Sequence, residues 1–161
     1  MCGRYSLSSP GELVAEVVGL DEALELEPRY NIAPTDEAPI VVADTGGDRR
    51  AERARWGLIP SWARDVSIGV RTINARAESV AERRAFRDAF RARRCLVPAD
   101  GFYEWRSMGG RKQPYHLTLA DGTPFAFAGL FELWRRAQDD WVRSFTILTT
   151  EPNSLVDPIA A

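Results

Sequence analysis

A cysteine at the second position is the first residue with distinctive chemistry. In Met1-Cys2-Gly3-Arg4, removal of the initiator methionine would leave Cys2 with a free α-amine and a thiol on adjacent carbons. Such a 1,2-aminothiol condenses with an aldehyde through its amine, and its thiol then closes a five-membered thiazolidine ring. Cysteine is small enough at this position to allow methionine removal. A cysteine after a start codon is also common and usually has no chemical role, so the pattern alone carries little weight.

A carboxylate lies among aromatic residues in Gly101-Phe102-Tyr103-Glu104-Trp105. Side chains of a strand alternate in direction, so Glu104 is expected to share a face with Phe102 and not with Tyr103 or Trp105. In apolar surroundings a carboxyl group can act as a general acid and base near neutral pH. The local pattern by itself favours the alternative, an outward glutamate between inward aromatic residues.

A polar pair and a tryptophan precede this motif. Asn74 and Arg76 stand two positions apart, so both face one way if the segment is extended. An amide can orient an amine or a sugar oxygen, and the guanidinium fork suits phosphate. Trp62 could stack on an unpaired base. A loop asparagine, a solvated arginine and a core tryptophan remain the open alternatives.

Other candidates for catalysis or metal binding are weak. The single histidine of the sequence, His116, follows Tyr115 in a strand pattern and is expected to be structural. Cys2 and Cys95 lie far apart and lack CxxC spacing, which fits a reducing cytosol better than a disulfide framework. Cys95 is expected to be a buried apolar residue. We therefore expect no metal and no cofactor.

Charge is distributed unevenly along the 161 residues. Residues 1–48 contain ten acidic residues and two arginines, whereas residues 49–94 contain thirteen arginines and five acidic residues. Phosphate-binding surfaces require such local positive charge, and a solvated helix face is the alternative of equal weight. Neither a run of eighteen apolar residues nor a basic region before an apolar run occurs, so no membrane span and no secretory signal are expected.

Apolar periodicity and turn residues predict one α+β domain over residues 1–161. Helices are predicted from a Ser8-Ser9-Pro10 cap to Gly19, over 78–94, and from about 152. Strands are predicted at 39–43, 50–58, 95–97, 102–106, 113–119, 125–134 and 142–149, whereas 29–35 and 63–75 are expected to be irregular. Strands joined by tight turns favour a largely antiparallel sheet with a few helices.

Five motifs occur in order and together carry a family resemblance. They are Met1–Tyr5, Arg29–Pro34, Trp56–Trp62, Ile73–Glu78 and Arg94–Trp105. The chain resembles the SRAP family, the SOS-response-associated peptidases, over nearly its whole length. The resemblance implies a barrel-like β core and a DNA-damage-response protein that binds single-stranded DNA at abasic sites. Family members link the sugar aldehyde covalently to the N-terminal cysteine, and the peptidase activity is the autocatalytic release of Met1.

The resemblance also implies roles at the matching positions. Cys2 would be the nucleophile, Asn74 would orient its amine or the sugar, and Glu104 would move protons as the ring opens and closes. The positions implied to contact DNA are Arg4 and Arg76 at flanking phosphates, Trp62 and Pro34 against neighbouring bases, Thr149 at the site, and Arg84. The implied partner is single-stranded DNA with abasic sites, and we expect a cytoplasmic monomer that associates with the nucleoid when bound to DNA.

One motif departs from the family pattern. After Asp157-Pro158-Ile159 the family continues with His-Asp-Arg-Met-Pro, whereas this sequence reads Ala160-Ala161. We therefore expect the catalytic histidine to be missing and the domain to be incomplete at its C-terminal side. Sugar opening and crosslink reversal should then slow more than DNA binding weakens. An N-terminal-nucleophile cysteine peptidase or amidase and a non-catalytic single-strand binder remain as alternatives.

Overall fold

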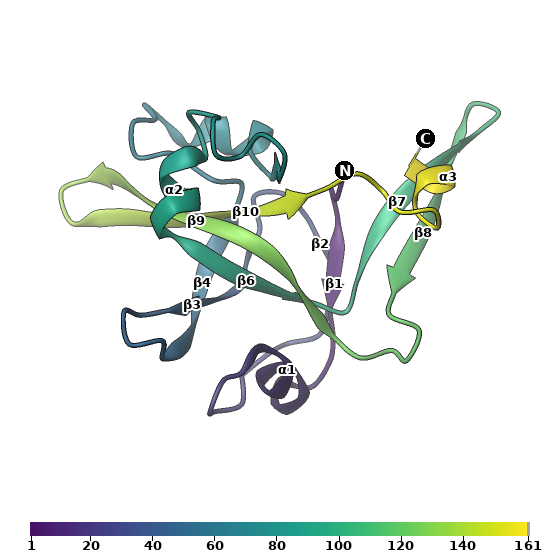
Figure 1. Cartoon of the computed structure of the whole chain (residues 1–161), viewed down its shortest axis with the longest axis horizontal. Coiled ribbons are helices and arrows are strands. Elements are labelled where there is room, and N and C mark those ends of the chain that lie inside the picture. The colour runs from purple at the N-terminus through teal and green to yellow at the C-terminus, as the bar shows by residue number, and fades with distance from the viewer. Residues whose placement is uncertain (161) are drawn as a thin grey trace.

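Apolar residues that alternate with polar ones form most of this chain into strands. The computed structural model describes residues 1–160 (Figure 1). In β3 (Glu37–Ala43), Ala38, Ile40 and Val42 point to one side and are buried. Asp44 and Gly47 close a tight turn into the antiparallel strand β4 (Arg49–Trp56), as the turn residues predict.

Within residues 1–160 the strands form two sheets, ordered β2-β1-β7-β8 and β4-β3-β6-β9-β10-β5. The other strands are β1 (Tyr5–Leu7), β2 (Arg29–Ile32), β5 (Asn74–Arg76), β6 (Arg94–Ala99), β7 (Gly101–Met108), β8 (Arg111–Thr118), β9 (Phe125–Ala137) and β10 (Asp140–Thr149). A parallel pairing of β10 with β4 closes the larger sheet into a barrel. The predicted α+β class, with a mostly antiparallel, barrel-like core, is confirmed.

The first helix is confirmed, but its cap is not. α1 (Gly11–Val18) ends at Gly19, whose left-handed backbone (φ 70°) favours glycine. Pro10 occupies the N-cap and no side chain caps the helix. Ser8 and Ser9 instead donate hydrogen bonds to the Asp100 carboxylate, so they join the first strand to the β6–β7 turn.

Four other predictions of local structure are wrong. The helix predicted over 78–94 is restricted to α2 (Arg87–Ala92), because Val80 and Phe86 are spaced too widely to form one apolar stripe and residues 79–86 form turns. Residues 29–32 are a strand because they pair with β1. Residues 63–75 contain a 3₁₀ helix (Val66–Arg71) and β5, and the last helix, α3 (Asp157–Ala160), starts later than predicted.

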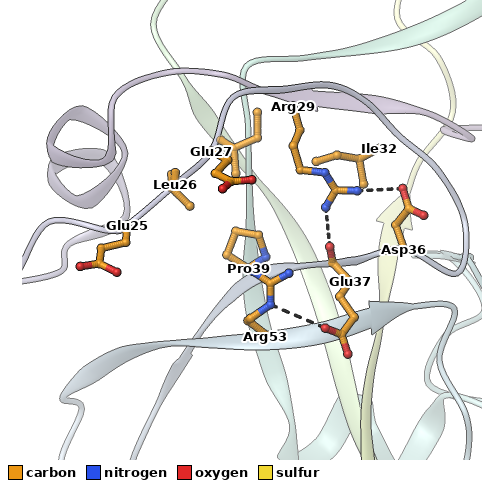
Figure 2. Close-up of a pocket in the computed structure, with 10 residues that line it drawn as sticks. Glu25, Leu26, Glu27, Arg29, Ile32, Asp36, Glu37, Pro39 and Arg53 are labelled. Atoms are coloured by element: carbon orange, nitrogen blue, oxygen red, sulfur yellow. Dashed lines mark hydrogen bonds and ion pairs between the residues drawn. The ribbon is translucent and has the colours of Figure 1, made fainter.

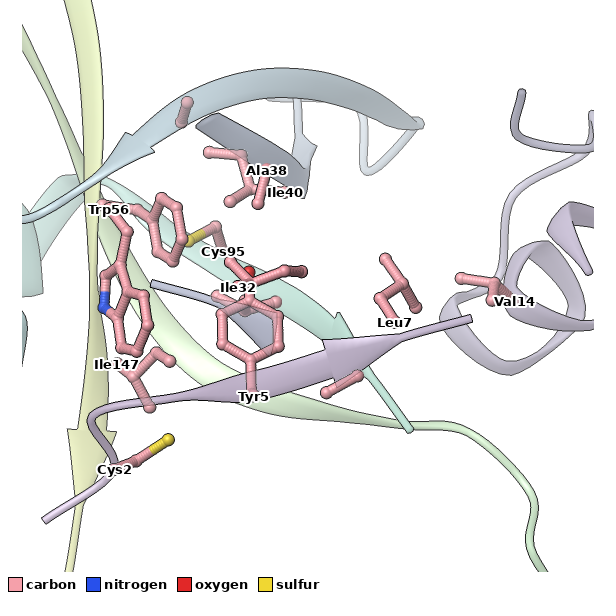
Figure 3. Packing of buried hydrophobic residues seen from close by; sticks show 14 of the residues in the cluster. Cys2, Tyr5, Leu7, Val14, Ile32, Ala38, Ile40, Trp56, Cys95 and Ile147 are labelled. Atoms are coloured by element: carbon pink, nitrogen blue, oxygen red, sulfur yellow. The ribbon is translucent and has the colours of Figure 1, made fainter. Parts of the chain in front are cut away.

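The core packs aromatic rings between the two sheets, and both cysteines belong to it (Figure 3). Tyr5, Trp56 and Phe145 are fully buried, and the Tyr5 and Trp56 rings meet edge to face at 5.2 Å. The Trp56 indole nitrogen donates to the Ile73 carbonyl at 2.9 Å, which satisfies its polar atom. Among residues 1–160 no helix is long and apolar enough to span a bilayer.

Candidate functional site

Pairing of β1 with β7 holds the N-terminus beside Glu104. Tyr5 lies opposite Phe102, and the Tyr103 amide donates to the Arg4 carbonyl at 2.9 Å. The α-ammonium of Met1 therefore lies 3.0 Å from Glu104 Oε1, as an ion pair. Cys2 is only 6% exposed and packs in the core cluster, at the end of the strand that carries Tyr5 (Figure 3). The first residues are thus part of the folded domain.

Glu104 faces the interior, as its alternation with Phe102 predicts. Glu104 is 8% exposed, whereas Tyr103 and Trp105 are half-buried on the opposite face of β7. The alternative of an outward glutamate between inward aromatic residues is wrong. The reason is tertiary, because the Glu104 face of β7 packs against the N-terminus, whose ammonium compensates the buried carboxylate.

The Cys2 thiol is neutral while Met1 is attached. Burial, and then the negative charge of Glu104, raise the pKa of the Cys2 thiol to about 12. The N-terminal ammonium and the hydrogen bond from Cys2 Sγ to the Arg4 carbonyl (3.7 Å) act in the opposite direction and are outweighed. Burial alone raises the pKa of the Cys95 thiol to about 12, which fits its predicted role as a buried apolar residue.

A cavity of about 420 Å³ opens beside this N-terminus. Four residues singled out from the sequence line it together: Cys2, Arg76, Glu104 and Thr149. The parallel pairing of β5 with β10 sets Arg76 opposite Thr149 at its rim. Ala160, which the resemblance matches to the family's histidine position, lines it too. The cavity is therefore the candidate functional site.

Asn74 is not among the residues that line this cavity, although its partner in the sheet, Ile147, is. The side chain of Ile147 packs in the cluster that contains Cys2. The Asn74 amide nitrogen donates to the Ile73 carbonyl at 3.0 Å. Its oxygen Oδ1 is buried and has no hydrogen-bond partner within residues 1–160. A buried acceptor without a partner is costly, so Asn74 has a free site for a donor.

The remaining predicted DNA contacts lie outside the cavity. Arg84 stacks its guanidinium 4.4 Å from the centre of the Trp62 ring, and Trp62 is 42% exposed. Arg4 reaches Asn31 Oδ1 at 3.5 Å. Pro34 is half-buried in the turn that precedes β3. The structure thus brings Trp62 and Arg84 together.

Ion pairs compensate part of the positive charge of the thirteen central arginines. Five are paired with carboxylates: Arg50 with Glu52, Arg53 with Glu37, Arg76 with Glu151, Arg87 with Asp88, and Arg93 with Glu132. The Arg76–Glu151 pair is the closest to the chemistry, with Nη1 and Oε1 2.7 Å apart at the cavity rim. Sequence reasoning missed Glu151, because its loop reaches Arg76 only in the folded chain.

A larger cavity of about 710 Å³ lies elsewhere, beside β2 and β3 (Figure 2). Arg29 pairs with Asp36 at 2.8 Å, and Arg53 pairs with Glu37 at 3.6 Å, on its wall. Its lining has two guanidinium groups against four carboxylates, the other two being Glu25 and Glu27. This excess negative charge repels phosphate, so the larger cavity does not suit nucleic acid.

His116 has the structural role that the sequence predicts. Its Nε2 lies 2.9 Å from Ser6 Oγ, and its ring stacks on Tyr103 at 4.6 Å. Among residues 1–160 no group of three or more potential ligands could hold a metal ion.

A mixed β barrel that holds an N-terminal cysteine beside a buried carboxylate defines a class of small α+β domains. The chain belongs to the SRAP family, described as "SOS response associated peptidase (SRAP)", which matches residues 1–161.

Similar proteins agree in sequence and in fold. The chain is 40% identical over 163 residues to the abasic site processing protein YoqW of Bacillus subtilis, covering 99% of this chain and 72% of that protein. It is 32% identical over 136 residues to the abasic site processing protein YedK of Escherichia coli, covering 81% and 59%. A crystal structure from Bacteroides thetaiotaomicron matches with a TM-score of 0.86 at 30% identity, covering 99% of this chain and 72% of that chain.

Proposed function

We propose that this protein processes abasic sites in single-stranded DNA by linking the lesion covalently to Cys2. One observation carries the proposal: the α-nitrogen of Met1, the residue before Cys2, lies 3.0 Å from Glu104 Oε1. Met1, Cys2 and Glu104 line the same cavity. An amine nucleophile, an adjacent thiol and a proton-transferring carboxylate are what condensation with an aldehyde requires. The names of the relatives support the same substrate.

Met1 must leave before this chemistry starts, because the nitrogen of Cys2 is otherwise part of a peptide bond. Hydrolysis of the Met1–Cys2 bond consumes one water and frees the Cys2 amine. Glu104 holds the Met1 ammonium at 3.0 Å and lines the same cavity as Cys2, so we expect it to exchange a proton with the newly freed amine. A free α-amine has a pKa of about 8, so about a tenth is unprotonated at pH 7.

Condensation then proceeds in two balanced steps. The Cys2 amine adds to the aldehyde carbon of the opened sugar, and loss of one water leaves an imine. The thiol sulfur adds to the imine carbon, its proton passes to the nitrogen, and the thiazolidine ring closes. Glu104 donates the proton that leaves with water and regains one from the nitrogen as the imine forms, and it then relays the thiol proton to the nitrogen as the ring closes. Since the amine attacks first, the reaction can begin while the thiol is neutral.

The surroundings suit a nucleic-acid strand. Arg76 at the rim can bind a phosphate beside the lesion once Glu151 is displaced. The free oxygen of Asn74 can accept a hydrogen bond from the amine or from a sugar hydroxyl. Trp62, with Arg84 on its ring, offers an exposed surface on which an unpaired base can stack.

Incubation with single-stranded DNA that contains one abasic site, followed by denaturing electrophoresis, tests the proposal. Protein whose intact mass lacks Met1 should give a shifted band, and Cys2→Ala and Met1-retaining protein should give none. Glu104→Gln should slow formation of the band while leaving binding of lesion-free DNA intact. Absence of a band from Met1-free protein would falsify the covalent mechanism. Turnover of a peptide in trans, unaffected by abasic DNA, would instead indicate a peptidase.

A further inference from the structure

The small sheet has one face toward the core and one face outward. Tyr5, Phe102 and Glu104 mark the inner face, because Tyr5 and Phe102 pair directly and both contact the core. Residues of opposite parity therefore point outward. Tyr103 pairs with His116, and Trp105 pairs with Pro114, so these partners share the outer face.

Rings are layered on this outer face. Tyr103 stacks on His116 at 4.6 Å with 26° between the planes, and it lies 6.4 Å from Trp105. A Cβ at Gly101 would lie 2.6 Å from His116 Nε2, so only glycine at this position leaves His116 room to reach Ser6. The arrangement is a packed aromatic layer on an antiparallel sheet.

A β-bulge extends the layer to the edge strand. Tyr5 pairs with Ile32 and Leu7 pairs with Arg29, so Tyr30 and Asn31 both lie opposite Ser6. The Tyr103 hydroxyl donates to the Tyr30 carbonyl at 2.7 Å, across β1. The Tyr30 residue is 66% exposed, so a base could reach its ring.

The charge of this face is positive. Glu104 is the single carboxylate in strands β1, β2, β7 and β8, and it points to the inner face. Arg4, which precedes β1, reaches Asn31, and Lys112 pairs with Ser107 in register with Tyr103 and Trp105. Aromatic rings beside cations, without carboxylates, suit unpaired bases joined by phosphates.

We infer that the outer face of the β2-β1-β7-β8 sheet is a stacking platform for the unpaired bases that flank the lesion. The inference rests on the proposed function, because the platform is continuous with the candidate site. Arg4 is two residues from Cys2, and Glu104 lies between Tyr103 and Trp105 on β7. One strand thus presents a carboxylate to the cavity and two rings to the platform.

Equilibrium binding of fluorescent strands tests the platform. The probes are lesion-free oligothymidine and a strand of equal length made of base-free spacers without aldehydes. The protein should bind oligothymidine more tightly than the spacer strand, because spacers cannot stack. Tyr30→Ala should weaken oligothymidine binding by about tenfold, the usual effect of losing one stacked base, and should leave spacer binding unchanged. Trp105→Phe, which keeps a ring, should bind more tightly than Trp105→Leu.

Matched controls separate the platform from general effects. Trp141→Ala removes an equally exposed ring (57% exposed) from the other sheet and should change neither affinity. Met108→Ala truncates an exposed side chain on the inner-face parity of β7 and should also be silent. Equal binding of both strands by the unmodified protein, or an unchanged affinity in Tyr30→Ala, overturns the platform. Covalent capture of abasic DNA by Cys2 would still stand in that case, so the two proposals fail separately.

Discussion

Replacement of Glu104 by glutamine should accelerate alkylation of Cys2 and not of Cys95. The two thiols share a pKa of about 12, but Glu104 contributes only to that of Cys2. At pH 8 a thiol with pKa 12 is about one ten-thousandth thiolate, against about a tenth for the ordinary value of 9.0, a factor of about a thousand. Removing the carboxylate should lower the pKa of the Cys2 thiol and so restore part of its thiolate fraction. Burial is the larger cause of the raised pKa, so the thiolate fraction should remain below that of an exposed cysteine.

The assay is iodoacetamide labelling of Met1-retaining protein, resolved by peptide mass at each cysteine between pH 7 and pH 11. Burial and Glu104 hold the thiol protonated, so Cys2 labelling should continue to rise tenfold per pH unit above pH 9, where an ordinary thiol levels off. Cys95 is an internal control for opening of the core. Equal acceleration at both cysteines in Glu104→Gln, or a plateau at pH 9 for Cys2, would refute the reasoning.

Three further predictions concern the rim, the core and the β6–β7 turn. Glu151→Gln should free Arg76 and tighten the binding of lesion-free single-stranded DNA by up to about fivefold, which corresponds to the free energy of an exposed ion pair. Binding is measured by an anisotropy titration. Glu82→Gln makes an equal change of charge and should have no effect in the same titration. Trp56→Ala should lower the free energy of unfolding by about 3–5 kcal/mol and the melting temperature by roughly 10 °C in a thermal melt, and an unchanged melt would contradict the assigned core. Partial burial would raise the pKa of Asp100, but hydrogen bonds from Ser8 and Ser9 lower it below its ordinary value. The ionised Asp100 carboxylate therefore stabilises the fold above about pH 4, and this stabilisation is lost as the pH falls through the lowered pKa. In denaturant titrations across pH, Asp100→Asn should lose less free energy of unfolding at acid pH than the unmodified protein.

Much of the fold was predictable because its signals are local. Strand alternation and glycine turns predicted seven of the strands within a few residues of their bounds. β2 was missed because four residues without apolar alternation become a strand only through pairing with β1. The long helix over 78–94 failed because residues 79–86 lack a continuous apolar stripe and form turns, and because Arg94 begins β6.

The sequence nominated residues for a site but did not predict which of them lie together. One cavity is lined by residues from four separate segments of the chain: Cys2, Arg76, Glu104 and Thr149. Nothing in the sequence predicts that these segments meet. Local pattern alone favoured the wrong side for Glu104. Glu151 belongs to none of the sequence motifs, and only the folded structure shows its contact with Arg76.

The sequence by itself determined the chemistry that each residue can perform and the alternation of side chains along each strand, since both depend on neighbours in the chain. Tertiary structure decided which face of β7 is inside, which carboxylate meets the N-terminus, and which rings form an outer layer. Those outcomes depend on the pairing of β1 with β7 and of β5 with β10, which joins residues about 70 to 100 positions apart. Cys2 is reactive by type, but its burial and the charge of Glu104 set when its thiol can ionise.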